Sequence, residues 1–377
     1  MPSDLDPLAN IGGTGPGGSA KPSSPSSSSS SNASSSPRLR RFEEVEFTGS
    51  AGEYFGLWFS TGFMTSLSVG FYGPWAKVRM NAYIYNNTYV KGHAFGYHAT
   101  GGQLLKGRIF AVLVTFLSIG LYLYYPPSLL VLMPLYFLVT PWLMNKALKF
   151  RANNVSWRNI RMHWNGTYWG TMMLMYIGPL VSIISLGILY PVMTRIYYNY
   201  IADNHSLGTT SFDADLEFGP CFGAFFIALF SAAIAGGAVI GLAYFVGTSL
   251  NPSLDNTEGL VAFEYSYIAA AFIFQTTYMS LCRNFMVKTL RLGRIARFDS
   301  NVSPLRLAWI KMTNGILIFA TLGFLYPYSV IREYMYMTSV TEYKIIGDIE
   351  AFIDRERYKQ SAYGDEFSEF NDIELSI

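Results

Sequence analysis

Charged residues are scarce in this chain, and their scarcity limits the class of protein it can be. Asp, Glu, Lys and Arg make up 14% of the 377 residues, whereas about 25% is usual in soluble proteins. Six long runs contain none of them: residues 54–76, 109–145, 162–194, 218–254, 265–282 and 312–331. Because about 20 apolar residues are enough to cross a bilayer, these runs exclude an ordinary soluble domain and predict an integral membrane protein.

Cysteines and catalytic motifs are scarce as well. The two cysteines, Cys221 and Cys282, stand at the edges of uncharged runs and give neither a disulfide framework nor a zinc pattern. His93 and His98 are five residues apart in an expected loop, a spacing that fixes no metal geometry. Nothing matches a phosphate-binding loop, a Ser-His-Asp set, HExxH or CxxC. We therefore expect no metal, no cofactor and no enzyme activity.

A short motif occurs three times along the chain. In each copy a glycine lies four residues before a proline, and a tyrosine lies nine residues after that proline. The copies are Gly70, Pro74 and Tyr83; Gly187, Pro191 and Tyr200; and Gly323, Pro327 and Tyr336. An arginine follows each proline, at Arg79, Arg195 and Arg332. This spacing predicts a repeated structural unit.

The motif and the composition together predict the organisation of the chain. We expect a disordered Gly/Pro/Ser-rich tail at 1–46, membrane repeat units at 47–166 and 167–304, a partial third unit at 305–350 and an acidic C-terminal tail at 351–377. The predicted fold is an all-α polytopic membrane protein, an internally repeated helical bundle with about five to seven membrane segments. Prolines break some of these segments, and short β-hairpins are expected outside the lipid, near residues 89–97 and 153–164.

The sequence leaves two arrangements of the repeats open. In the first, all four loops between the apolar segments lie in the cytoplasm, because Lys and Arg gather in them, and the Gly-Pro segments are re-entrant. In the second, each unit crosses the membrane three times, so that the second unit is inverted relative to the first, as in some transporters.

Several stretches beyond the triple motif resemble a known family. They include Gly70-Phe71-Tyr72-Gly73-Pro74-Trp75-Ala76-Lys77-Val78-Arg79, Phe95-Gly96-Tyr97-His98, Leu105-Lys106-Gly107-Arg108, Pro141-Trp142, Asn165-Gly166 and Gly364-Asp365-Glu366-Phe367. This pattern, over about residues 47–377, resembles the YjgN-like family of bacterial inner-membrane proteins. The resemblance implies a multi-pass protein of the bacterial cytoplasmic membrane, and it supplies no catalytic residue.

Two groups of residues are candidates for a functional site. Arg79, Arg195 and Arg332 could bind an anion or a lipid phosphate, or they could anchor the chain at the interface. The second group holds the polar residues expected inside the membrane, where such groups are costly and often functional. Its members are Glu264, Gln275, Lys311 and Asn314.

The functional expectation follows from these features. A transporter or channel-like protein is favoured by repeats, proline-interrupted apolar segments and intramembrane polar groups. The alternative is a non-catalytic envelope protein that organises lipids or partner proteins. In both cases the partners are the lipid bilayer and a small-molecule or lipid ligand. The net charge of only +2 gives no reason to expect nucleic acid, and the sequence does not specify an oligomeric state.

Overall fold

The computed structural model describes residues 42–250 and 256–359, without the side chains of 247–250, 256–260 and 262. These residues belong to one unit, Arg40–Ile377. Residues 1–41 of the predicted disordered tail, and residues 360–377 of the predicted acidic tail, lie outside the described residues. The last part of the predicted N-terminal tail is not irregular, because strands begin at Glu43.

Short strands join into one antiparallel sheet, whose order follows the chain from β2 to β11 and ends on β1. The strands are β1 (Glu43–Glu44), β2 (Glu46–Phe47), β3 (Thr88–Val90), β4 (His93–Tyr97), β5 (Val155–Trp157), β6 (Ile160–Trp164), β7 (His205–Leu207), β8 (Thr210–Asp213), β9 (Arg291–Leu292), β10 (Ala296–Ser300) and β11 (Thr341–Ile345). Glu43 pairs with Tyr343 of β11, whereas Glu46 pairs with Tyr89 of β3. Since only Val45 separates β1 from β2, this segment closes the sheet into a ring.

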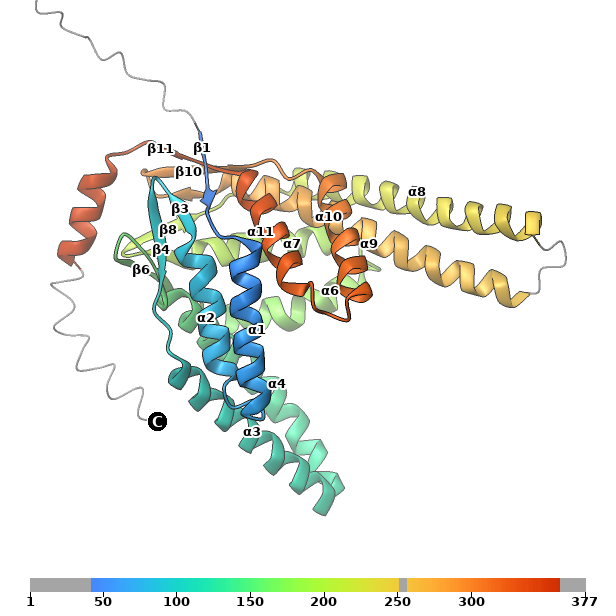
Figure 1. Ribbon diagram of the computed structural model, residues 1–377, viewed down its shortest axis with the longest axis horizontal. Coiled ribbons are helices and arrows are strands. Elements are labelled where there is room, and N and C mark those ends of the chain that lie inside the picture. The colour runs from blue at the N-terminus through green and yellow to red at the C-terminus, as the bar shows by residue number, and fades with distance from the viewer. Residues whose placement is uncertain (1–41, 251–255, 360–377) are drawn as a thin grey trace, which may run out of the picture. The chain divides into compact units, whose positions relative to one another are not determined.

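Helix pairs are inserted between neighbouring strands of the ring (Figure 1). They are α1 (Ala51–Leu67) with α2 (Gly73–Asn86); α3 (Gly101–Tyr124) with α4 (Leu129–Asn153), joined by the 3₁₀ turn η1 (Pro126–Ser128); the broken helix α5 (Tyr168–Met172), η2 (Met173–Ile177) and α6 (Gly178–Ile184) with α7 (Tyr190–Asp203); α8 (Phe218–Leu250) with α9 (Asn256–Thr289); and α10 (Pro304–Ala320) with α11 (Tyr326–Ser339). Each pair starts and ends at adjacent antiparallel strands. All helix pairs therefore leave the ring at one end, and the tight turns lie at the other.

The predicted all-α fold with separate hairpins is wrong. The expected hairpins around β3–β4 and β5–β6 pair with one another, as Phe95 does with Trp157, and continue into the same sheet. The physical reason is that an isolated hairpin leaves unpaired backbone groups at both edges. Pairing between segments about 60 residues apart satisfies those groups, but local alternation of polar and apolar residues does not reveal it.

The predicted count of five to seven membrane segments is also wrong. Within the described residues, three helices are long and apolar enough to cross a membrane: Gly101–Tyr124, Pro126–Asn153 and Phe218–Val246. The count was too high because the Gly-Pro segments form short helix pairs that turn back. Of the two arrangements left open by the sequence, the ring agrees with the one in which all four loops lie on the same side.

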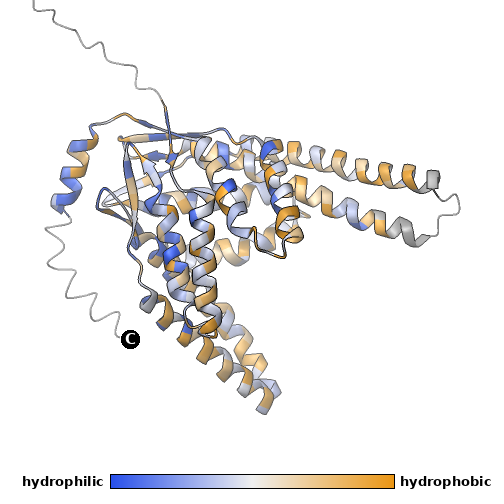
Figure 2. Cartoon of the chain, in the orientation of Figure 1, coloured by the Kyte–Doolittle hydropathy of each residue, from blue (hydrophilic) through white to orange (hydrophobic). Residues whose placement is uncertain are grey.

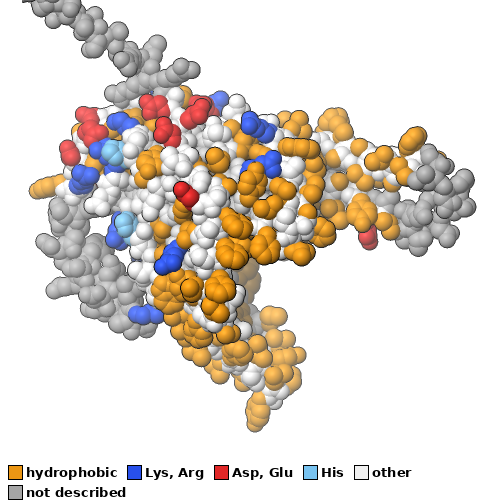
Figure 3. Space-filling view, viewed as in Figure 1, with side chains coloured by type: hydrophobic (Ala, Val, Ile, Leu, Met, Phe, Trp, Pro, Cys, Tyr) orange, Lys and Arg blue, Asp and Glu red, His pale blue; other side chains and the backbone are white. Residues whose placement is uncertain are grey.

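The polar and apolar parts of the molecule are separated along the helix pairs. Figure 2 shows hydrophobic residues over α3, α4 and α8, and more hydrophilic residues in the strands. In Figure 3, charged side chains gather around the sheet, while apolar side chains cover the helix pairs. Successive pairs also touch: α2 contacts α3, α4 contacts α5, α7 contacts α8, α9 contacts α10, and α11 contacts α1. The helices thus follow one another around the ring in chain order.

A helix at residues 349–359 follows β11 and packs against the sheet. Its Phe352 and Ile353, each 1% exposed, join a core with Trp157, Ile160 and Leu207 of the strands. This contact buries large apolar side chains, each of which contributes about 1.5–3 kcal/mol on burial. The C-terminal helix is therefore part of the folded unit, although the sequence predicted an acidic tail from residue 351.

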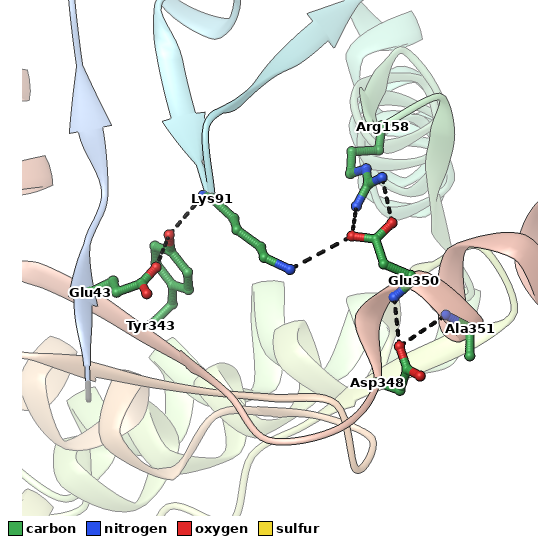
Figure 4. A network of polar contacts seen from close by, with 7 residues as sticks. All are labelled: Glu43, Lys91, Arg158, Tyr343, Asp348, Glu350 and Ala351. Atoms are coloured by element: carbon green, nitrogen blue, oxygen red, sulfur yellow. Dashed lines mark hydrogen bonds and ion pairs between the residues drawn. The ribbon is translucent and has the colours of Figure 1, made fainter. Parts of the chain in front are cut away.

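Polar contacts fix the same helix at the turn end of the ring (Figure 4). Arg158, in the β5–β6 turn, donates two hydrogen bonds to Glu350, at 2.8 and 2.7 Å, and Lys91 of the β3–β4 turn lies 3.7 Å from the same carboxylate. Deeper in the contact, the buried carboxylate of Glu356 accepts from the backbone N–H of Thr209 at 2.6 Å and from its hydroxyl at 2.7 Å. Three turns of the ring therefore hold one helix.

Candidate functional site

The triple motif forms the same turn in three helix pairs: α1–α2, α6–α7 and α10–α11. Gly70, Gly187 and Gly323 have φ angles of +87°, +85° and +92°, in the left-handed region that favours glycine. The residues just before them, at 69, 186 and 322, have φ angles of +50°, +51° and +50°. Each proline then lies at the start of the following helix, where its missing N–H costs nothing.

Every backbone N–H group in these turns has an acceptor. In the second turn, the donors from Ser185 to Tyr190 bind carbonyl oxygens of the turn or the Ser185 hydroxyl, and Gly187 reaches back to Ser182 at 2.7 Å. Residues 68–73 and 321–326 make the equivalent hydrogen bonds. Lipid offers no hydrogen bonds, so a turn inside the hydrocarbon must satisfy its donors internally. These turns meet that requirement.

The tips of the three pairs are apolar and exposed. Val69 is 88% exposed, Leu186 91% and Leu322 92%. Aliphatic side chains at the tip of a loop in water would be costly, whereas in lipid they are in a matching solvent. Together with the internally satisfied donors, this composition is typical of a re-entrant helix pair.

The tyrosine of each motif holds the two helices of its pair together. The hydroxyl of Tyr200 accepts from the N–H of Thr167 at 2.9 Å and donates to its carbonyl at 3.0 Å. Thr167 is the residue that caps the N-terminus of α5. Tyr83 makes the same pair of contacts with Ser50, and Tyr336 with Ser303. The motif tyrosines therefore have a structural role in all three units.

The second pair differs from the other two, and a cavity lies beside it. Its first helix contains the π-helical turn η2 followed by Gly178 and Pro179, whereas α1 and α10 are continuous. Such π-turns often mark functional sites. A cavity of about 720 Å³ lies between this broken helix, α7, α8 and α9. Its volume is within the usual range for small-ligand sites, about 300–1,000 Å³.

The cavity wall is mostly apolar and carries a few polar groups. Ile183, Leu186 and Phe225 line it, and so do Tyr197 and Tyr198. The hydroxyls of Tyr197 and Tyr198 form no hydrogen bond with the described part of the chain, and the same holds for Tyr190. The predicted intramembrane residue Gln275 also lines the cavity, and its amide nitrogen reaches only the sulfur of Met279, at 3.2 Å. The residues around one apolar space therefore include several with unused hydrogen-bonding groups.

The other predicted polar residues lie elsewhere. Lys311, Asn314 and Arg332 come together between α10 and α11 in the third pair. Arg332 donates to the side-chain oxygens of Asn314 at 3.0 Å and Thr313 at 2.8 Å, and Lys311 lies 3.7 Å from Glu333. Asn314, which is 5% exposed, also donates to the backbone of the facing helix. These groups largely satisfy one another.

The remaining candidates stay apart. Arg195 donates to the carbonyl of Leu216 at 2.6 Å and lies 4.1 Å from the ring centre of Phe218, so it fastens the start of α8. Arg79 is exposed on α2, 5.8 Å from the ring of Tyr72. Glu264 is exposed on α9 and does not line the cavity. The three arginines each remain in their own unit.

Sequence reasoning missed the cavity tyrosines Tyr190, Tyr197 and Tyr198. Two signals could have directed attention to them. The stretch around Tyr197 is rich in tyrosine, and Gly178-Pro179 marks a break in the facing helix. The sequence does not reveal that α8 and α9 pack against this break, because α8 begins at Phe218 and α9 only at Asn256.

Residues 42–370 match the family DUF898, whose description reads "Bacterial protein of unknown function". The chain belongs to that family. No solved structure matches it significantly.

Relatives of the chain carry the name that the sequence suggested. It is 24% identical over 353 residues to the inner membrane protein YjgN of Salmonella typhimurium, covering 81% of this chain and 89% of the relative. It is 25% identical over 364 residues to YjgN of Escherichia coli O157:H7, covering 81% and 88%. The resemblance to the YjgN-like family is therefore confirmed. These relatives are inner membrane proteins by name, and the apolar helices of this DUF898 chain fit a membrane location.

Proposed function

We propose that this DUF898 protein is a non-catalytic, multi-pass protein of the bacterial inner membrane that binds an amphipathic lipid in the cavity beside α6 and α7. The observation that carries the proposal is the apolar cavity with unused hydroxyls. Leu186 and Ile183 lie toward the tip of the pair, where an acyl chain would pack. Tyr197 and Tyr198 lie nearer the sheet, where a polar headgroup would accept and donate hydrogen bonds.

The cost of the unused groups supports this assignment. A polar group left without a partner in an apolar medium costs about 1–3 kcal/mol by protein mutational data. Binding a molecule with hydrogen-bonding atoms at one end and methylene groups at the other removes that cost at several tyrosines at once. A purely apolar ligand would leave the hydroxyls unpaired, and a small polar ligand would leave the apolar wall uncovered.

The membrane arrangement supports access to such a lipid. If α8 crosses the bilayer, α9 must cross back, because β8 and β9 are paired in the ring. With α3 and α4 this makes four crossings, while the three short pairs enter the lipid and return. By the positive-inside rule, the lysines and arginines around the ring favour a ring that faces the cytoplasm. The cavity then lies at the depth of the cytoplasmic leaflet.

The proposal is tested by filling the cavity with a larger side chain and measuring how much lipid the purified protein retains. Ser182 lines the cavity, so Ser182→Phe is expected to displace the lipid that co-purifies in a mild detergent, as measured by native mass spectrometry and lipid extraction. Ile318→Phe changes the equivalent position, five residues before the motif glycine, in the third pair, and should leave the bound lipid unchanged. Equal lipid retention in the Ser182→Phe protein and the wild type would contradict the proposal.

Transport is a second candidate, favoured by the helices that follow one another around the ring. Reconstituted vesicles would test it: flux of labelled lipid or small solutes above that of protein-free vesicles supports transport. Tight lipid binding without flux supports the binding role alone.

A further inference from the structure

The two cysteines of the chain face one another at the base of α8 and α9. Cys221 lies in the first turn of α8, and Cys282 lies near the end of α9, so each is close to the sheet. Both side chains are completely buried, with 0% exposure. The chain has two cysteines among its 377 residues, and both lie in the contact between α8 and α9.

The register of the two antiparallel helices places the thiols opposite each other. Phe225 of α8 contacts Tyr278 of α9, with ring centres 6.3 Å apart. Cys221 lies one turn before Phe225, and Cys282 lies one turn after Tyr278, so the same register brings them together. Cys282 packs in one buried cluster with Ala224 of α8, three residues after Cys221.

The two helices pack closely through small side chains. The face of α8 toward α9 carries the small buried residues Ala224 and Ala228. Further along, a Cβ added to Gly236 would lie 3.3 Å from the Cβ of Ala270. A disulfide needs Cα atoms about 4.4–6.8 Å apart, a separation that is reached where small residues let helix backbones approach.

The pair lies one layer of side chains away from the cavity. Tyr278 lines the cavity and packs in the same cluster as Cys282, with Tyr190 beside it. The thiols thus lie behind one layer of side chains, next to a space that opens toward the lipid. Hydrogen peroxide and lipid hydroperoxides can enter such a space.

We propose that Cys221 and Cys282 form a reversible disulfide when a peroxide reaches them. One thiolate attacks a peroxide oxygen, the O–O bond breaks, and a sulfenic acid and water form. The second thiolate attacks the sulfenic sulfur, and hydroxide leaves and takes up the second thiol proton as water. Two electrons pass from the thiols to the peroxide. A cellular dithiol reverses the reaction by disulfide exchange, as expected of a transient disulfide in a reducing compartment.

The disulfide would fasten the base of α8 to α9. The wall of the cavity that contains Tyr278 would then be fixed to α8, so oxidation would restrict movement of that wall. This inference stands on the helix contact alone and goes beyond the proposed lipid binding. A failure of one does not decide the other.

The experiment uses the full chain in isolated membranes. Membranes are treated with hydrogen peroxide, the peroxide is removed, and the protein is denatured in the presence of N-ethylmaleimide, so that buried free thiols are blocked as well. After the excess N-ethylmaleimide is removed, the protein is reduced and labelled with a polyethylene glycol maleimide. We expect two labels per chain after peroxide and none without it. A peptide containing both cysteines should appear by mass spectrometry before reduction and disappear after it.

Matched variants test whether the disulfide requires thiols at positions 221 and 282 or forms between any two buried cysteines. Cys221→Ser and Cys282→Ser should each abolish the linked peptide. Cys221→Ser combined with Ala228→Cys moves the thiol two turns along α8 and should form no link to Cys282. Ser211→Cys, exposed on β8 in a chain lacking both native cysteines, reports that the oxidant was effective.

Several results would overturn the proposal. Both native thiols could remain free under conditions that oxidise the Ser211→Cys control. The native pair could instead form only links between chains, or stop at a sulfenic acid that dimedone captures. The wild-type measurement decides each of these outcomes without any variant that might fold poorly.

Discussion

Tyr336 binds the backbone of Ser303 through a single hydroxyl, 33 residues away in the sequence. The hydroxyl accepts from the N–H of Ser303 at 2.9 Å and reaches its carbonyl at 3.4 Å. The same separation of 33 residues recurs between Tyr83 and Ser50 and between Tyr200 and Thr167. Each tyrosine therefore joins the second helix of a pair to the start of the first, at the level where the pair meets the ring.

Removing this hydroxyl should weaken the fold. In Tyr336→Phe the N–H of Ser303 loses its acceptor, and the net contribution of one such hydrogen bond is about 0.5–1.5 kcal/mol. We expect a lower midpoint of thermal unfolding in detergent, measured by the fluorescence of the native tryptophans. Tyr328→Phe, in an exposed position of the same helix, is the control and should unfold like the wild type.

The glycine of the motif should resist substitution. Gly187 has a φ of +85°, and an L-residue in the left-handed region costs roughly 1–2 kcal/mol. Gly187→Ala should therefore lower the unfolding midpoint. Gly219→Ala, within α8 and with open space around the added methyl group, should instead be neutral or slightly stabilising. Equal effects at both positions would argue against strain in the turn.

The C-terminal helix should be released when its buried carboxylate is removed. Glu356→Ala leaves the N–H and hydroxyl of Thr209 without their acceptor, at a cost of about 1–3 kcal/mol. We expect faster hydrogen exchange across residues 349–359 and easier proteolysis there. Asp354→Ala, exposed on the same helix, should keep the exchange of the wild type. Unchanged exchange in Glu356→Ala would show that the apolar contacts alone hold the helix.

The same helix should loosen in acid. The hydrogen bonds from Arg158 lower the pKa of Glu350 to about 2, from an ordinary value of about 4.3. A carboxylate whose pKa is lowered in the folded state stabilises that state above its ordinary pKa, and the contribution is lost as the pH falls toward the lowered value. Exchange at residues 349–359 should therefore rise between about pH 4.3 and pH 2. Arg158→Gln should reduce this pH dependence.

The tips of the short pairs should be shielded by lipid. In a chain with Cys221→Ser and Cys282→Ser, Leu186→Cys should not react with a membrane-impermeant maleimide applied from either side. Ser211→Cys should react from the cytoplasmic side only.

Reporters fused after Asn87, Asn154, His205 and Asn301 should all report the cytoplasm, because these positions lie in or beside the ring. A periplasmic signal from Asn301 would contradict this arrangement.

Some features of the fold could be predicted because they are local. The uncharged runs indicate a membrane protein, and the spacing from Gly187 to Pro191 to Tyr200 indicates a repeated unit, since a left-handed turn and a helix start depend on residues close in sequence. Of the candidate site residues, Gln275 was found because an amide within an apolar run is conspicuous. Tyr190 and Tyr198 were not, since a tyrosine near the interface has an ordinary explanation.

The sequence by itself determined that the chain carries long apolar segments and a turn repeated three times. Only the tertiary structure decided that the hairpins form one ring, that the Gly-Pro pairs turn back, and that Gln275 and Tyr198 line the same cavity. Hydropathy and turn chemistry act within a few residues, so the sequence displays them directly. Strand pairing and helix contact join segments tens of residues apart, and their partners are chosen by the free energy of the whole assembly rather than by any local pattern.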